Sequence, residues 1–214
     1  MKNIKWPLQF LATLLVSTFL SNNIIKVVFL ILFWVLSFRP LNRKELLFFL
    51  ITNIVFVFSN FGALMNSTFS FTEKDILLMP YNELLMWGFY CLNAHRFIGI
   101  HRNQEMSQWK LLTYAILFAA SFSLVHDEIR LMLLLVGIFV IALLNFRSKR
   151  DLTYVGYFLF MGAVVESLGV HFNLWHYPHA RFFEFPLWAP LMWMNIGLIM
   201  SQVAIWFFRD TSRS

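Results

Sequence analysis

The stretch LTYVGYFLFMGAVVESLGVHF, residues 152–172, decides the fold class of this chain. A helix needs about 20 apolar residues to cross a bilayer, and this stretch is long enough, with Glu166 as its only Asp, Glu, Lys or Arg residue. A second apolar run, from Leu77 to Ile100, holds Glu83. A carboxylate in hydrocarbon is costly unless it is neutralised, paired or hydrated. The two runs therefore predict membrane helices, and both glutamates are candidates for function.

The composition supports the same class. Of the 214 residues, 59% are hydrophobic and 13% are charged, and the mean hydropathy is +0.67, whereas soluble domains average about 25% charged residues. We expect one integral membrane domain over residues 1–214, without a separate soluble domain. The single cysteine, Cys91, excludes an intramolecular disulfide.

Hydropathy predicts an all-α polytopic membrane helix bundle with eight spans. The first two apolar segments are short and are separated by Ser21-Asn22-Asn23, so they are read as a tight helical hairpin; seven spans would result if they formed one helix. The predicted spans are 7–20, 24–38, 45–64, 77–99, 111–125, 129–146, 152–172 and 187–208.

The distribution of basic residues fits eight spans with both termini in the cytoplasm. In that topology all but four of the 17 basic residues are on the inside, as the positive-inside rule requires. The four exceptions are Lys26, Lys74, Arg130 and Arg181. The membrane topology and the attraction to anionic lipid head groups thus account for the net charge of +6. No nucleic-acid partner is therefore expected. The pattern favours a bacterial inner membrane and leaves the oligomeric state open.

This topology gathers polar residues in the outer halves of the spans. Glu83 and Glu166 each lie about six residues below the outer end of their span, which at the helical rise places them roughly 9 Å deep. Three asparagines are expected in the same outer halves, namely Asn60, Asn82 and Asn195. We predict that the two carboxyl groups face one cavity.

The outer loop of residues 173–186 is rich in aromatic residues and contains two prolines, so it is expected to fold back as a lid. Aromatic walls with a few polar groups are typical of ligand cavities. Candidate lining residues are Trp175, Tyr177, Trp188 and Trp193.

Two acids in such a cavity favour acid–base chemistry. A carboxyl group in apolar surroundings can stay protonated and act as a general acid, while a second carboxylate or His171 stabilises a cation or accepts the departing proton. Aromatic faces stabilise cations as well. Glu83, Glu166 and His171 are the candidate catalytic residues, and an isoprenoid or another lipid with carbon–carbon double bonds is the expected substrate.

Two motifs carry a resemblance to known families. Pro80-Tyr81-Asn82-Glu83, followed by Trp87 and Tyr90, looks like the Pro-x-(acid/amide)-Glu element of the small membrane lycopene cyclases. Glu166-x-x-Gly169, Trp175-x-Tyr177 and the aromatic stretch 186–193 are similar to carotenoid hydratases and integral-membrane terpene cyclases.

The resemblance implies cyclisation, hydration or isomerisation of an isoprenoid, with protonation by Glu83 and Glu166. It covers about half of the chain, and Asn82 stands where the cyclases have a second acid. Around the acids, the expected substrate-binding residues are Asn60, Tyr81, Asn82, Trp87, Trp175, Tyr177, Trp188, Trp193 and Asn195.

Other interpretations stay open. The glutamates could act as interhelical glue by hydrogen bonding to Asn60 or Asn195. A metal-dependent membrane hydrolase would use His126, His171, His176 and His179, although their spacing is not an established ligand pattern. The chain could also be a proton-coupled transporter or a lipid-binding membrane protein. No cofactor is expected, since no nucleotide-binding loop, serine nucleophile motif or haem ligand pair is visible.

Overall fold

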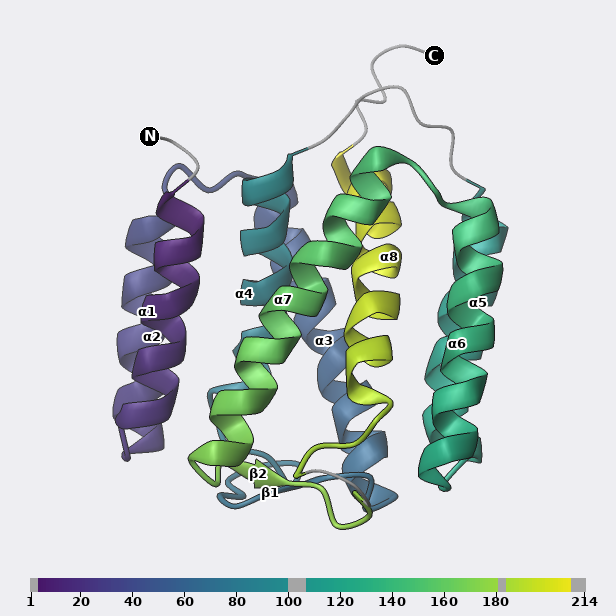
Figure 1. The fold of residues 1–214 in the computed structure, drawn as a ribbon. Helices are drawn as coiled ribbons and strands as arrows, with labels where there is room; N and C mark the ends of the chain where they lie inside the picture. Colours follow the sequence, from purple (N-terminus) through teal and green to yellow (C-terminus); the bar gives the residue numbers. More distant parts are fainter. Residues whose placement is uncertain (1–3, 100–106, 181–183, 209–214) are drawn as a thin grey trace. The chain divides into compact units, whose positions relative to one another are not determined.

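The structure is a computed structural model that describes residues 4–99, 107–180 and 184–208. Over these residues it contains eight helices and one pair of two-residue strands (Figure 1). The elements of the first half are α1 (Lys5–Phe19), α2 (Asn23–Ser37), α3 (Arg43–Met65), β1 (Ser70–Phe71) and α4 (Glu83–Ile98). Those of the second half are α5 (Gln108–Leu124), α6 (Glu128–Asn145), α7 (Lys149–His171), β2 (Trp175–His176) and α8 (Ala189–Phe208).

Polar residues in the connections set where several helices begin. The Asn22 side chain accepts hydrogen bonds from the backbone N–H groups of Ile24 and Ile25, both at 3.1 Å, so α2 starts immediately after the predicted break. Asn42 and Glu45 form a capping box at the start of α3. The first two apolar segments are therefore separate helices, and α1 packs against α2.

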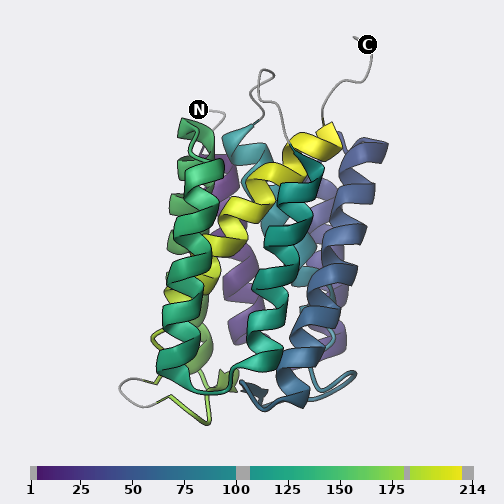
Figure 2. The same ribbon diagram turned by 90° about the vertical axis from the view of Figure 1, so that its right-hand side faces the viewer.

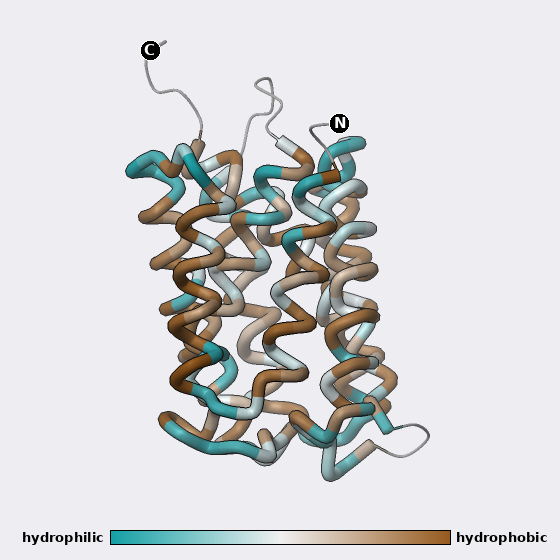
Figure 3. Tube along the Cα trace, turned by 90° about the vertical axis from the view of Figure 1, so that its left-hand side faces the viewer, coloured by the Kyte–Doolittle hydropathy of each residue, from teal (hydrophilic) through white to brown (hydrophobic). Residues whose placement is uncertain are grey.

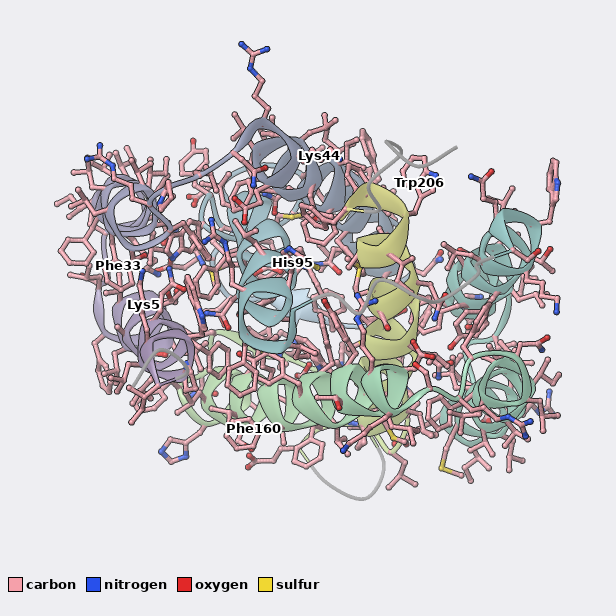
Figure 4. The ribbon with its side chains drawn as sticks, turned by 90° about the horizontal axis from the view of Figure 1, so that it is seen from above. Lys5, Phe33, Lys44, His95, Phe160 and Trp206 are labelled. Carbon is pink, nitrogen blue, oxygen red and sulfur yellow. The ribbon has the colours of Figure 1, made fainter. Side chains whose placement is uncertain are left out.

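Among the described residues, four helices are long and apolar enough to cross a membrane: α3, α6, α7 and α8. The helices are apolar along most of their length and polar toward their ends (Figure 3). Large apolar side chains lie on their surfaces, for example Phe160 of α7 and Trp206 of α8, which are 61% and 54% exposed (Figure 4). Such surfaces suit a lipid environment.

The chain divides into two compact units. Unit 1 comprises residues 1–97 and 167–178, that is α1 to α4, both strands and the last turn of α7. In this unit Trp34 Nε1 of α2 donates to Thr13 Oγ1 of α1 at 2.9 Å. Arg96 of α4 pairs with Glu45 of α3, and its Nη2 donates to Glu45 Oε2 at 2.7 Å. The core of unit 1 includes Phe48 and Phe89, both fully buried.

Unit 2 comprises residues 98–166 and 179–214, which hold α5, α6, α8 and most of α7. Helix α8 packs against both α5 and α6 (Figure 2). Gly197 permits close contact with α7, because a Cβ there would lie 2.8 Å from the Tyr154 carbonyl oxygen. All eight predicted apolar segments are thus helical, but the fourth helix starts at Glu83 rather than near residue 77.

Candidate functional site

Three of the predicted site residues of unit 1, Asn60, Glu83 and Trp87, lie where α3 meets α4. On α3 the residues Asn53, Phe56 and Asn60 recur at spacings of three and four, so they share one helix face. Across from them the Asn53 side chain accepts the Gly88 N–H at 2.6 Å, and the Phe56 ring stacks on Trp87 with centroids 4.3 Å apart. We call this contact the α3–α4 seam; its members are Asn53, Phe56 and Asn60 with Glu83, Trp87 and Gly88.

Glu83 lies at one end of the seam. Asn60 Nδ2 donates to Glu83 Oε1 at 3.1 Å, and both side chains are half-buried. The prediction that Glu83 lies about two helical turns inside the fourth span is wrong, because Glu83 is the first residue of α4. A carboxylate is favoured in this first turn by the helix dipole. The hydrogen bond between Asn60 and a glutamate, one of the alternatives left open by the sequence, is present.

Asn82 lies directly beside Glu83 and is only 7% exposed. Within the part of the chain that the structure describes, its buried Oδ1 accepts no hydrogen bond. Tyr81, the residue before Asn82, is fixed by the connector between β1 and α4, because its N–H donates to Asp75 Oδ2 at 3.0 Å. The Tyr81 side chain is exposed. The segment that carries Asn82 and Glu83 is therefore held in place although one of its buried acceptors is unsatisfied.

The predicted lid folds back in unit 1. β2 pairs antiparallel with β1 in the register Ser70↔His176 and Phe71↔Trp175, and the Thr72 N–H donates to the Leu174 carbonyl at 2.9 Å. Trp175 packs directly on Gly169, where a Cβ would lie 2.0 Å from the indole ring. The Tyr177 ring is 6.0 Å from that of Phe69. Beneath the strands is an apolar cluster of Val57, Leu64, Phe71 and Met79. Residues 181–183 of the predicted lid are outside the described residues.

Glu166 belongs to unit 2 and is 7% exposed. Its Oε1 accepts a hydrogen bond from Trp193 Nε1 of α8 at 3.0 Å. The indole ring can approach because Gly162, one turn earlier on α7, has no side chain; a Cβ there would lie 2.1 Å from Trp193 Cγ. Glu83 and Glu166 are thus each engaged within their own unit, and their facing one cavity stays a prediction.

The other predicted residues of unit 2 link helices to one another. Asn195 is fully buried; its Nδ2 donates to the Leu191 carbonyl at 2.8 Å, and its Oδ1 accepts the Tyr114 hydroxyl from α5. Trp188 is 5% exposed and meets the Phe122 ring edge-on at 5.3 Å. Their role as ligand-binding residues stays a prediction.

The histidines give no metal site among the described residues, where no group of three or more His, Cys, Asp or Glu side chains could hold an ion. His171 ends α7, is exposed and meets the Phe172 ring edge-on at 4.9 Å. The remaining three are also exposed: His126 and His179 in unit 2 and His176 in unit 1.

Sequence reasoning missed a polar cluster at the first turn of α7. Asp151 is fully buried and accepts hydrogen bonds from the Ser148 hydroxyl at 2.7 Å and from Gln202 Nε2 at 2.8 Å, as well as from Ser201. The signal was present as an acid beside the basic residues Lys149 and Arg150, which were taken only as topology markers.

The chain is similar in fold to MvINS, a mycobacterial Insig homologue from Mycobacterium vanbaalenii. A crystal structure of a cross-linked MvINS trimer gives a TM-score of 0.70 at 9% identity and covers 82% of this chain and 100% of that chain. A second MvINS crystal structure gives 0.67 at 10% identity and covers 78% and 94%. No protein-family model and no curated protein matches the sequence.

This likeness concerns the fold, and together with the apolar helices it confirms a polytopic helical membrane protein. It also corrects two expectations. The resemblance to lycopene cyclases, carotenoid hydratases and membrane terpene cyclases is wrong, because the structural neighbours are Insig homologues. The acid–base enzyme acting on an isoprenoid is wrong for the same reason. The matching motifs were short and aromatic, a composition that membrane interfaces favour in unrelated proteins.

Proposed function

We propose that this chain is an integral membrane protein that binds a lipid, with the polar group of the lipid at Asn82 and Glu83. The observation that carries the proposal is the buried Asn82 Oδ1, which accepts no hydrogen bond within the described residues. A buried acceptor without a partner costs about 1–3 kcal/mol. A ligand that brings a donor to this position would remove that penalty.

A hydroxyl group fits the neighbourhood of Asn82. A hydroxyl donates one hydrogen bond and accepts others, so it could donate to Asn82 Oδ1 and still interact with the Asn60–Glu83 pair. Both members of this pair are half-buried. The ligand class is therefore a lipid with at least one free hydroxyl in its head group.

The apolar part of such a ligand would extend into the hydrocarbon around the helices. Val55 and Phe58 of α3 are 54% and 66% exposed, but at 3.6 residues per turn they lie on the side of α3 away from Asn60, so the ligand's chain is not assigned to them. Lipid tails are as apolar as the helix surface, so the hydrocarbon adds little net affinity within a bilayer. The hydroxyl would set the position of the lipid and supply its selectivity.

The contact between Asn60 and Glu83 suits binding. Asn60 donates to Glu83 through its carboxamide, and a carboxamide neither gains nor loses a proton at ordinary pH. This hydrogen bond fixes the direction of the carboxyl group and does not supply it with a proton.

The test compares oleyl alcohol with its methyl ether, two lipids of matched chain that differ in the hydroxyl donor. Thermal unfolding is followed in detergent micelles at increasing lipid concentration. The alcohol is expected to stabilise the protein at lower concentration than the ether. Replacing Asn82→Leu removes the acceptor and is expected to weaken alcohol binding about fivefold, the equivalent of about 1 kcal/mol.

The matched control is Asn145→Leu, because Asn145 lies in unit 2 at the end of α6 and bonds only locally, to the Ile141 carbonyl at 2.9 Å. It should leave the difference between the two lipids unchanged. Equal stabilisation of the unmodified protein by the alcohol and the ether would refute the proposed site.

We also propose that all eight helices lie within the bacterial inner membrane, with both termini cytoplasmic. The exposed basic residues Arg147 and Lys149 between α6 and α7 support this orientation. Lys149→Cys in a Cys91→Ser background should react with a membrane-impermeant maleimide in inverted vesicles and stay unreacted in intact cells. The opposite pattern would reverse the topology.

A further inference from the structure

The connector between β1 and α4 contains a tight turn at Leu77 and Leu78. Ile76 and Met79 form an antiparallel bridge, in which the Met79 N–H donates to the Ile76 carbonyl at 2.9 Å and the Ile76 N–H to the Met79 carbonyl at 3.0 Å. The φ angles of Leu77 and Leu78 are +50° and +64°. Two central residues with positive φ characterise the type I′ turn.

Leucine is an unfavourable residue at both positions. Type I′ turns strongly prefer Asn-Gly, Asp-Gly or Gly-Gly, because these residues tolerate positive φ. A leucine side chain there crowds the following carbonyl oxygen. The local backbone therefore gives no reason for two successive leucines.

Packing gives no reason either. Ile76, Leu77 and Leu78 are 44%, 39% and 40% exposed, whereas the neighbouring Met79 is fully buried. We call Ile76, Leu77 and Leu78 the apolar tip. Residues that oppose both local preference and solvation are expected where they serve a function. The exposed part of the apolar tip is therefore available for contact with something outside the described protein.

The surroundings of the tip within unit 1 indicate lipid. Asn23 Nδ2 donates to Asp75 Oδ2 at 2.6 Å, which ties the base of the tip to the first residue of α2. At this same end of α2, Ile24 and Ile25 are 65% and 59% exposed, as expected of a membrane protein's lipid-facing surface. The apolar tip thus follows directly on a residue that is bonded to this end of α2, while charged residues occur just before it, at Glu73 and Lys74.

We propose that the apolar tip inserts into the adjacent leaflet of the bilayer and anchors the connector between β1 and α4 in the membrane. The charged residues before the tip lie at the level of the lipid head groups. This anchor is independent of the proposed lipid site, because it requires bulk bilayer rather than one bound molecule and involves neither Asn82 nor Glu83.

The test measures the depth of single nitroxide spin labels in the full chain, reconstituted in phosphatidylethanolamine–phosphatidylglycerol vesicles. Labels are attached at Leu78→Cys and, as the control, at Lys74→Cys, each in a Cys91→Ser background. Collision rates are measured with oxygen, which concentrates in lipid, and with a nickel chelate, which stays in water. The label at residue 78 should collide mainly with oxygen, and the label at residue 74 mainly with nickel.

Equal nickel collision at the two positions would place the tip in water and overturn the proposal. Low collision with both reagents at residue 78 would mean that protein covers the tip, which overturns it as well. A second variant carries Leu77→Asn and Leu78→Gly, with the label at Ile76→Cys. It replaces the two leucines by Asn-Gly, a sequence that favours the same type I′ turn. Its label should move several-fold toward nickel relative to Ile76→Cys alone, and an unchanged ratio would show that the leucines are not the anchor.

Discussion

The contact between Gly162 and Trp193 yields a sharp prediction about how unit 2 is held together. In Gly162→Ala, the new Cβ would lie 2.1 Å from Trp193 Cγ and 2.4 Å from Cδ1 and Cδ2, so the indole ring must move. Overpacking of this kind costs about 1–3 kcal/mol. If the ring shift also breaks the 3.0 Å hydrogen bond from Trp193 to Glu166, a further penalty of about 1–3 kcal/mol follows.

Alanine is favoured over glycine in a helix by about 1 kcal/mol, which offsets part of this loss. The net destabilisation is therefore about 1–5 kcal/mol, and its middle corresponds to a fall in Tm of roughly 10 °C for a chain of this length. Thermal unfolding in detergent, followed by tryptophan fluorescence and far-UV circular dichroism, measures it.

The same helix supplies a matched control. Gly156 of α7 is exposed, and a Cβ there would meet no atom within 4 Å. Gly156→Ala should raise Tm by roughly 2–4 °C through helix propensity alone. The same substitution six residues apart is thus expected to act with opposite sign. If Gly162→Ala raised Tm as Gly156→Ala does, the close packing of Trp193 on α7 would be refuted.

Three further outcomes are expected. Asp151→Leu removes a fully buried acceptor and strands its donors, and it should destabilise unit 2 by about 3 kcal/mol in denaturant unfolding; a loss below about 1 kcal/mol would argue against the cluster. Gly169→Ala places a Cβ 2.0 Å from Trp175 and should release β2 from β1, visible as faster amide exchange in both strands. Leu77→Asn with Leu78→Gly relieves two unfavourable φ angles and should stabilise the detergent-solubilised protein by about 1 kcal/mol; an unchanged or lower stability contradicts the type I′ turn.

The helices could be predicted from the sequence because hydropathy averages over many residues. Seven of the eight predicted segments begin within about one turn of the observed helices. The exception is the segment predicted from residue 77. Leu77, Leu78 and Met79 count as apolar, but Leu77 and Leu78 have positive φ and Pro80 disfavours a helical conformation for the residue before it. Hydropathy does not register backbone conformation, so Glu83 was placed inside a helix that it begins.

The partners of the acids were harder to predict. Asn60 and Glu83 are on consecutive helices, and two polar residues near one membrane level have few other partners, so their hydrogen bond could be anticipated. One partner of Glu166 is the indole N–H of Trp193, whose approach depends on the missing side chain of Gly162. A glycine in an apolar span gives no indication in one sequence of which ring lies against it.

The error about function arose from the interpretation of the two acids. An acid within a membrane protein must be neutralised, paired or hydrated, and the sequence argument took catalysis as the reason for its presence. One donor to Glu83 is an amide, and one donor to Glu166 is an indole. Neither group exchanges its proton in the pH range of an acid–base reaction, whereas both hold a carboxyl oxygen in a fixed direction. Each acid thus accepts at least one fixed hydrogen bond, and a ligand at Glu83 would meet an oriented polar edge whose unsatisfied member is the Asn82 oxygen.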